Sequence, residues 1–380
     1  MNKKFLSTVL LSIMTLTFLS GCGSSSSDSE VIKIGGIGPL SGDAATYGTS
    51  VKEGAELYLQ EINDSGGIDG KKIELIFEDD QADPNSAKQA FNKLVDKDGV
   101  CSILGAVTSG ATLAIAPDST NKKIPMITPS ATEPTITDVG GNFMFRGCFV
   151  DSFQGKILAK YTKETLNKKT AAVLYNVGSD YSKGIADAFK KEFEDNGGKV
   201  VQFLSYNDGD TDFKAQLTKI NSNAPDVLVL PDYYNVVGLI AKQAREMGIK
   251  SQFLGGDGWE SEDLIKIGGD AVDGALYINH YFSEDDTDFV KNFVTSYKEK
   301  YNKEPDAFAA LGYDTFKCLV TAIDDADSTD SEKIKDALLK VNLDSVTGSI
   351  SFDENRSAVK SACIIKIDKD KKVLADKVNP

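Results

Sequence analysis

The chain has 380 residues, with 57 acidic and 42 basic side chains and a formal net charge of −15 at pH 7. This acidity argues against binding to nucleic acid and against an electrostatic hold on an anionic membrane. The single histidine, His280, cannot supply a zinc site or complete a catalytic triad by itself. We therefore expect no metal, no other cofactor and no enzymatic activity.

The first 21 residues are typical of a secretory signal peptide. Lys3 and Lys4 precede an apolar stretch over residues 5–19, and Leu-Ser-Gly then leads directly to Cys22. A transmembrane anchor is the alternative, but the stretch is shorter than the roughly 20 apolar residues that span a bilayer. Leu-Ser-Gly-Cys resembles the lipobox of bacterial lipoproteins, which implies that Cys22 is lipidated, with palmitate among the acyl chains. Residues 22–30 are rich in serine and predict a flexible tether.

Strands and helices alternate through the first part of the chain, which predicts a parallel sheet with helices on both faces. Asp83-Pro84 provides a helix N-cap followed by proline at the first helical position. The expected strands are 31–36, 73–78, 100–104 and 124–128, and the expected helices are 50–63, 84–94 and 110–119.

The same alternation restarts after Arg146, so we expect two similar α/β lobes. The second series comprises strands 170–175, 200–205, 226–230, 252–255 and 274–278, with helices 153–166, 182–196, 213–221 and 235–247. Helices near 288–300, 307–325 and 331–341 follow, and then a hairpin-like pair, 348–352 with 358–367. We predict a first lobe of 31–148 plus 281–350 and a second lobe of 149–280 plus 351–380.

Ligands of such sheets bind beyond the carboxyl ends of the strands, beside helix N-termini. The loop 35–42 fails the dinucleotide pattern G-x-G-x-x-G, which argues against a nicotinamide enzyme. The loop 105–112 offers amides and the Ser109 hydroxyl to a carboxylate, although Ser109 could equally serve only as a helix cap. Asp257 lies among glycines and could equally be a turn residue.

Several stretches of the chain resemble the leucine/isoleucine/valine-binding proteins: 38–42 with 47–48, 105–112, 127–134, 180–181, 238–248 with 252–255, and 312–314. That family comprises the type I periplasmic binding proteins of branched-chain amino acid importers. The resemblance covers residues 32–367 and implies two Rossmann-like lobes, a three-strand hinge and a ligand in the cleft between the lobes.

The resemblance also implies roles for individual residues. The ligand carboxylate is bound by Ser109, Gly110 and Thr132, and the backbone around Ser130 and Ala131 contributes to the ammonium site. Tyr181 closes from the other lobe, and Asp257 pairs with the ammonium, where the branched-chain prototype has glutamate. Candidates for the side-chain pocket are Tyr47, Tyr233 and Trp259.

The expected function is therefore that of a substrate-binding lipoprotein on the extracytoplasmic face of a bacterial membrane. It would bind a free amino acid, most simply leucine, isoleucine or valine, and deliver it to the permease of an ABC importer as a monomer. Two alternatives stay open at this point. One is a protein of the same fold that binds another small ligand, such as an amide, a short peptide or a sugar. The other is an exported enzyme, for which the sequence offers no nucleophile–base pair.

Overall fold

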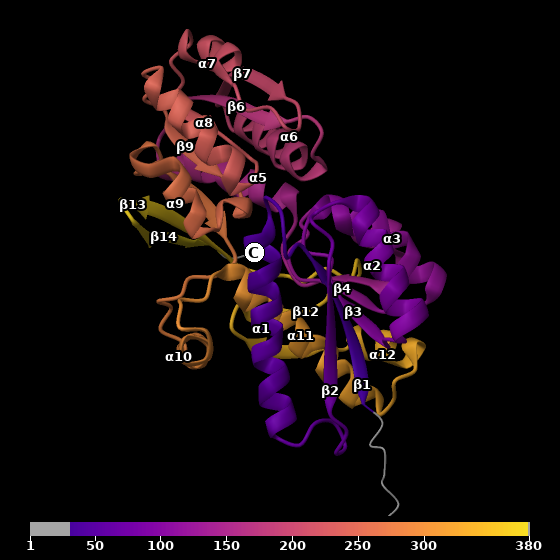
Figure 1. Ribbon diagram of the computed structural model, residues 1–380. Coiled ribbons are helices and arrows are strands. Elements are labelled where there is room, and N and C mark those ends of the chain that lie inside the picture. Colours follow the sequence, from indigo (N-terminus) through magenta and orange to yellow (C-terminus); the bar gives the residue numbers. More distant parts are fainter. Residues whose placement is uncertain (1–30, 379–380) are drawn as a thin grey trace, which may run out of the picture.

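The computed structural model describes residues 31–378. The predicted signal peptide, Cys22 and the whole of the predicted tether lie outside this range. No helix within residues 31–378 combines the length and the apolar character that crossing a bilayer requires. The described chain forms two α/β lobes, one built around each of two large sheets (Figure 1).

The first lobe surrounds a parallel sheet in the order β2-β1-β3-β4-β5. Its strands are β1 (Ile32–Gly38), β2 (Ile73–Asp79), β3 (Ser102–Leu104), β4 (Met126–Thr128) and β5 (Met144–Arg146). The helices of this lobe are α1 (Ala45–Asp64), α2 (Pro84–Lys93), α3 (Ser109–Lys122), α4 (Ile136–Val139), α10 (Asp288–Tyr301), α11 (Ala307–Ala326) and α12 (Ser331–Leu338). Helices α2 and α3 pack together on one face, and α1 and α11 pack together on the other.

The close packing of α1 on α11 depends on two glycines. A Cβ atom on Gly54 would lie 1.9 Å from the carbonyl oxygen of Ala309, and one on Gly312 would lie 2.2 Å from that of Val51. Backbone atoms of the neighbouring helix occupy this space, so only glycine permits the two helices to approach so closely. This pair fixes the amino-terminal end of α1, which carries Tyr47, against the start of α11.

The second lobe surrounds a mixed sheet in the order β14-β13-β10-β9-β8-β6-β7. Its strands are β6 (Thr170–Asn176), β7 (Lys199–Tyr206), β8 (Val227–Val229), β9 (Gln252–Gly255), β10 (Leu276–Asn279), β13 (Ala362–Asp368) and β14 (Lys371–Val378). Its helices are α5 (Asp151–Lys160), α6 (Asp180–Asp195), α7 (Lys214–Asn221), α8 (Tyr234–Glu246) and α9 (Glu262–Gly268). Strands β13 and β14 run antiparallel to their neighbours, while the rest of the sheet is parallel.

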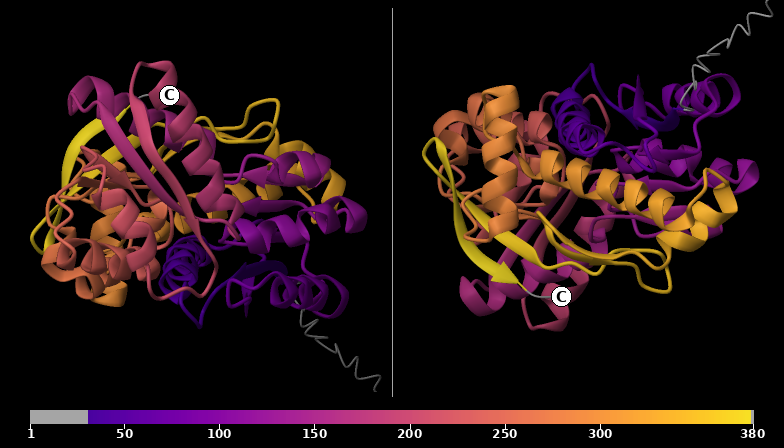
Figure 2. Two further views of the ribbon diagram at one scale, coloured as in Figure 1. Left: turned by 90° about the horizontal axis from the view of Figure 1, so that it is seen from above. Right: turned by 90° about the horizontal axis from the view of Figure 1, so that it is seen from below.

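The carboxy-terminal pairing differs from the expected hairpin. Strand β12 (Gly348–Ser351) pairs with β11 (Asn342–Ser345), and β13 pairs with β10 and β14. Only a single bridge, between Phe352 and Ala358, remains of the predicted pair. The β13–β14 turn contains Lys369 at a φ of 58°, which is uncommon for a non-glycine residue and gives no sequence signal. Figure 2 shows the yellow strands β13 and β14 alongside the elements of the second lobe.

Within residues 31–378, the chain passes between the two sheets three times. The first passage, 147–150, joins β5 to α5, and the second begins at His280 after β10. The chain is still beside the first sheet at Ala358, whose N–H donates to the carbonyl of Arg146 at 2.9 Å, and it enters the second sheet at Ala362. The third passage is therefore 359–361, later in the chain than the boundary expected at residue 351, because Ser357 still bridges to Arg146 at the edge of the first sheet.

Candidate functional site

A small cavity lies between the lobes, at the carboxyl ends of strands from both sheets. Both lobes contribute to its wall, so the cavity exists only while the lobes are in contact. Its lining combines aromatic rings, hydroxyl groups and one acidic side chain: Tyr47, Val107, Thr108, Ser109, Ser130, Tyr181, Tyr233, Asp257, Gly258 and Phe308.

The first lobe contributes the loops that follow β3 and β4. Helix α3 begins at Ser109, and Thr108 occupies the N-cap position without a capping side-chain hydrogen bond. The Ser109 hydroxyl instead accepts from the N–H of Glu133 at 3.3 Å, so the view of Ser109 as only a helix cap is wrong. Ser130 donates its hydroxyl proton to the carbonyl of Val107 at 2.8 Å, which ties the two loops together. The start of α3 therefore presents amides and hydroxyls to the cavity, as an anion requires.

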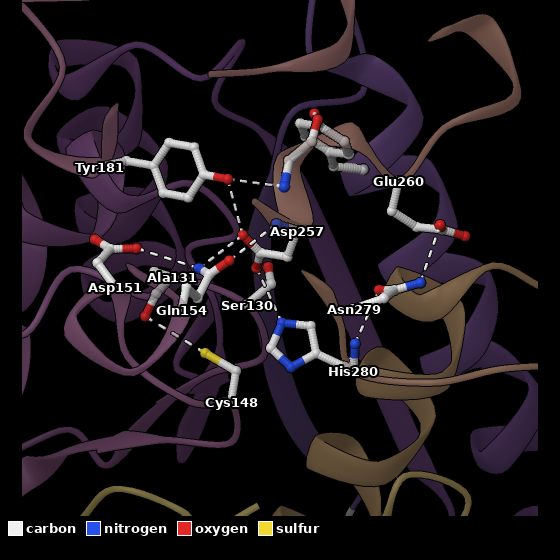
Figure 3. Close-up of polar contacts among 12 residues, drawn as sticks. Ser130, Ala131, Cys148, Asp151, Gln154, Tyr181, Asp257, Glu260, Asn279 and His280 are labelled. Carbon is white, nitrogen blue, oxygen red and sulfur yellow. Dashed lines mark hydrogen bonds and ion pairs between the residues drawn. The ribbon is translucent and has the colours of Figure 1, made fainter. Parts of the chain in front are cut away.

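The second lobe contributes Asp257, which stands in the short turn after β9 and is 3 % exposed. Its Oδ1 accepts from the Tyr181 hydroxyl and from Gln154 Nε2, both at 2.9 Å, and its Oδ2 lies 2.9 Å from His280 Nε2 (Figure 3). The Asp257 N–H in turn donates to Gln154 Oε1 at 2.9 Å. Three hydrogen-bond donors therefore converge on the Asp257 carboxyl group, which acts as the acceptor for all of them. A residue that only formed a turn would not need these contacts.

Burial controls the protonation of the groups around this carboxylate. It raises the pKa values of Tyr47, Tyr181 and Tyr233 well above the usual range of phenols, so these hydroxyls keep their protons. Burial lowers the pKa of His280, which therefore stays neutral at pH 7. Burial also raises the pKa of Asp151, whose Oδ1 lies 3.3 Å from Gln154 Nε2. Asp257 is thus surrounded by neutral donors and not by a permanent cation.

Aromatic side chains connect the two lobes beside the carboxylate. Tyr47 of α1 donates to the carbonyl of Gly258 and stacks on Phe308, with ring centroids 4.3 Å apart. Tyr234 donates to the carbonyl of Asp43 at 2.7 Å. Tyr233 stacks on Tyr181 at 5.0 Å and meets Tyr47 edge to face at 5.4 Å. The cavity therefore has an apolar, aromatic side next to its charged end, and hydrogen bonds across the cleft hold the lobes closed.

Comparison with known proteins agrees with this architecture. The family model of the periplasmic binding proteins matches residues 31–372. The leucine-, isoleucine-, valine-, threonine- and alanine-binding protein of Pseudomonas aeruginosa is 33 % identical over 337 residues, which cover 88 % of this chain and 89 % of that protein. This chain belongs to the periplasmic binding protein family.

Solved structures of family members superpose closely on this one. A leucine-binding protein of Thermotoga maritima has a TM-score of 0.87 and 37 % identity, covering 92 % of this chain and 99 % of that one. The branched-chain amino acid transporter substrate-binding protein of Streptococcus pneumoniae, in complex with isoleucine, has a TM-score of 0.87 and 38 % identity, covering 92 % of this chain and all of that one. The expected fold, two α/β lobes of the type I periplasmic binding protein kind, is confirmed. The family is one of substrate-binding proteins of transport and works outside the cytoplasm.

In this family member the structure brings six of the ten predicted ligand-binding residues to the cavity wall, and four lie elsewhere. Ala131 and Thr132 are buried behind the wall, where the carbonyl of Thr132 accepts from the N–H of Asp151 at 2.8 Å. Gly110 is exposed, one residue beyond Ser109 in α3. Trp259 is fully buried in the second lobe, where its Nε1 donates to the carbonyl of Leu230 at 2.9 Å. Its indole packs over Gly255, so it supports the turn that carries Asp257 and does not line the side-chain pocket.

Several residues at the cavity were not predicted as site residues. Val107 and Thr108 belong to the loop 105–112, which the sequence singles out, and Gly258 is next to Asp257. The sequence could therefore have identified these three residues as candidates. Phe308 lies in the first turn of α11, where an apolar residue looks like ordinary helix core. His280 and Gln154 approach Asp257 from 23 and 103 residues away along the chain, and nothing local to either position reveals this.

A second, larger groove opens on the other side of the α1 amino terminus. Its buried acids already have partners. Glu260 Oε1 accepts from Lys372 Nζ at 3.0 Å, and Asp306 caps α11 while its Oδ2 accepts from the Ser50 hydroxyl at 2.6 Å. Within residues 31–378, no three His, Cys, Asp or Glu side chains are grouped so that they could hold a metal ion.

Proposed function

We propose that this protein binds a free α-amino acid with an aliphatic side chain in the cavity between its lobes. The observation that carries the proposal is the placement of Asp257 on one lobe opposite the Ser109 and Ser130 loops on the other. An amino acid carries an ammonium and a carboxylate that are both costly to desolvate, so each needs a partner of its own. Asp257 suits the ammonium, and the start of α3 suits the carboxylate.

The aromatic side of the cavity supports an apolar ligand side chain. Tyr47, Tyr233 and Phe308 offer ring faces and edges there, and Val107 adds an aliphatic contact. The relatives point the same way, because their names specify leucine, isoleucine and valine, and the Streptococcus pneumoniae protein holds isoleucine. We therefore propose leucine, isoleucine or valine as the ligand. The proposal keeps a supporting part for the three predicted residues beside or behind the cavity wall, through the backbone of Gly110 and Ala131 and the hydroxyl of Thr132.

Ligand binding closes the lobes in this proposal. The two charge partners stand on different lobes, so only a zwitterion neutralises both at once, and the closed arrangement depends on it. The three passages 147–150, 280–281 and 359–361 form the hinge, which divides the chain into a first lobe of 31–148 plus 281–358 and a second lobe of 149–280 plus 359–378. The closed form would then be recognised by the permease of an ABC importer, with the protein acting as a monomer.

Thermal stabilisation by each of the twenty amino acids tests the ligand assignment, because a ligand that binds only the native state raises its apparent stability. We expect leucine, isoleucine or valine to give the largest increases in melting temperature. Calorimetry should then give a dissociation constant of about 1 μM or tighter, roughly −8 kcal/mol. Saturation by a sugar, an amide or a short peptide without a response to any free amino acid would replace this proposal with that ligand class.

We propose in addition that Cys22 is the lipidated first residue of the mature protein. The support is the sequence Leu-Ser-Gly-Cys after a basic and then apolar leader. Cys22→Ala should release the protein from the membrane fraction or leave the signal peptide uncleaved. If this variant partitions into detergent as the natural protein does, the lipoprotein proposal is wrong, and the ligand assignment is not affected.

A further inference from the structure

The carboxylate of Asp257 has one oxygen fully occupied and one oxygen partly free. Oδ1 accepts two hydrogen bonds, from Tyr181 and Gln154, whereas Oδ2 accepts one, from His280. A carboxylate has about two acceptor positions on each oxygen. The position that remains is on Oδ2, so a ligand ammonium in this cavity would bond to the oxygen that His280 holds.

The His280 ring can serve only as a donor from Nε2. Its partner is a carboxylate oxygen, so Nε2 must carry the proton, and the neutral ring then has a bare Nδ1. Nδ1 is buried and has no hydrogen-bond partner among residues 31–378, and the ring stacks on Phe149 with centroids 3.6 Å apart. A second proton on this ring would find no acceptor. Asp257 therefore gains a fixed hydrogen bond without losing its negative charge to a neighbouring cation.

The position of His280 in the chain explains how its ring is held. It is the first residue after β10, at the start of the second passage between the lobes, and its N–H donates to Asn279 Oδ1 at 2.9 Å. Phe149, which stacks on it, belongs to the first passage. Gln154, the other side chain that reaches from this region to Asp257, lies in the first turn of α5 directly after that passage. Two of the three passages thus fix the orientation of one carboxylate.

We propose that His280 is a positioning residue that sets the specificity of this site for an ammonium group, by fixing Oδ2 of Asp257 toward the cavity. The inference rests on the proposed function and deepens it. His280 does not touch the ligand in this arrangement. Without the His280 ring, Oδ2 of Asp257 would be free to rotate away or to bind water, which weakens its contact with the ligand ammonium. The contacts with the ligand carboxylate and the ligand side chain would stay intact.

The test compares two ligands that differ in the ammonium alone. Leucine and 4-methylpentanoate, which lacks that group, are titrated into the natural protein, His280→Leu, His280→Asn and His280→Gln. Loss of one hydrogen bond to a charged group predicts that His280→Leu and His280→Asn weaken leucine binding about 10-fold or more. Their affinity for 4-methylpentanoate should stay within about twofold of the natural protein, because its binding does not use Oδ2. Gln keeps a donor of similar reach, so His280→Gln should restore most of the leucine affinity.

Tyr281→Phe is the matched control, because it removes a buried hydroxyl from the next residue of the same passage, and that hydroxyl has no hydrogen-bond partner in the described part of the chain. It should change neither affinity. Equal loss for both ligands in His280→Asn, or no loss for leucine, would overturn the positioning role. If His280→Leu fails to fold, His280→Asn and His280→Gln decide the matter. Absence of leucine binding in the natural protein would refute the proposed function itself, a distinct outcome.

Discussion

Replacing Asp257 by asparagine tests the charge that the proposed function requires. The substitution keeps the shape of the side chain, and its Oδ1 can still accept from Tyr181 and Gln154, which both lie 2.9 Å from Asp257 Oδ1. The substitution removes the negative charge. It also replaces Oδ2, which accepts from His280, by an amide group whose N–H faces the N–H of His280. The ligand ammonium would then enter a buried site without an anionic partner.

The expected loss follows from the burial of the pair. Asp257 is 3 % exposed and contacts no Lys or Arg among residues 31–378, so the ammonium would supply the counter-charge that this part of the chain does not. Breaking a desolvated, hydrogen-bonded charge pair costs about 2–5 kcal/mol of binding. At about 1.4 kcal/mol per tenfold change, the dissociation constant for leucine should rise by roughly 30-fold to several thousand-fold.

Isothermal titration calorimetry of Asp257→Asn with leucine measures this change, and circular dichroism establishes that the fold is native. Asp330→Asn is the matched control, since Asp330 is also an aspartate that accepts a backbone N–H, from Lys333 at 3.1 Å, but caps the distant helix α12. Its leucine affinity should equal that of the natural protein. Binding by Asp257→Asn within about twofold of the natural protein would refute the assignment of Asp257 as the ammonium partner.

Three further results are expected. Trp259→Phe should lower the free energy of unfolding by about 1–3 kcal/mol, because it removes a fully buried ring and its hydrogen bond, while leucine affinity changes less than about threefold. Gly54→Ala should destabilise by about 1–3 kcal/mol or more in chemical denaturation, since its Cβ would meet the Ala309 carbonyl, whereas Gly110→Ala, which points into open space, should stay within about 0.5 kcal/mol. Burial raises the pKa of Asp232 to about 6, above its value in the unfolded chain, so the folded state binds the proton more tightly. The contribution of Asp232 to the free energy of unfolding therefore falls as the pH rises from about 4 to about 6. Unfolding free energies of the natural protein relative to Asp232→Asn should therefore drop by up to about 3 kcal/mol over that range, and a flat difference would contradict the assigned shift.

The sequence determined the repeating architecture of this protein. Alternating apolar strands and amphipathic helices depend on local periodicity, which a single sequence displays directly, and each lobe formed as that pattern predicts. The sequence also predicted the start of helix α2 correctly. Asp83 is its N-cap and accepts from the N–H groups of Asn85 and Ser86, and Pro84 is the first helical residue. Strand-end loops also identified Ser109 and Asp257 as site candidates, because a parallel sheet brings such loops to one edge, and the family resemblance added Ser130.

Only the tertiary structure decided which distant residues meet. The partner of a strand depends on contacts that have no local periodicity, so the sequence placed 348–352 with 358–367, whereas β12 pairs with β11 and β13 lies between β10 and β14. An aromatic residue is apolar whether it lines a cavity or fills a core, and for this reason Trp259 was assigned to the pocket and Phe308 was not. His280 and Gln154 reach Asp257 only because two passages between the lobes run side by side, an arrangement fixed by the packing of the whole chain.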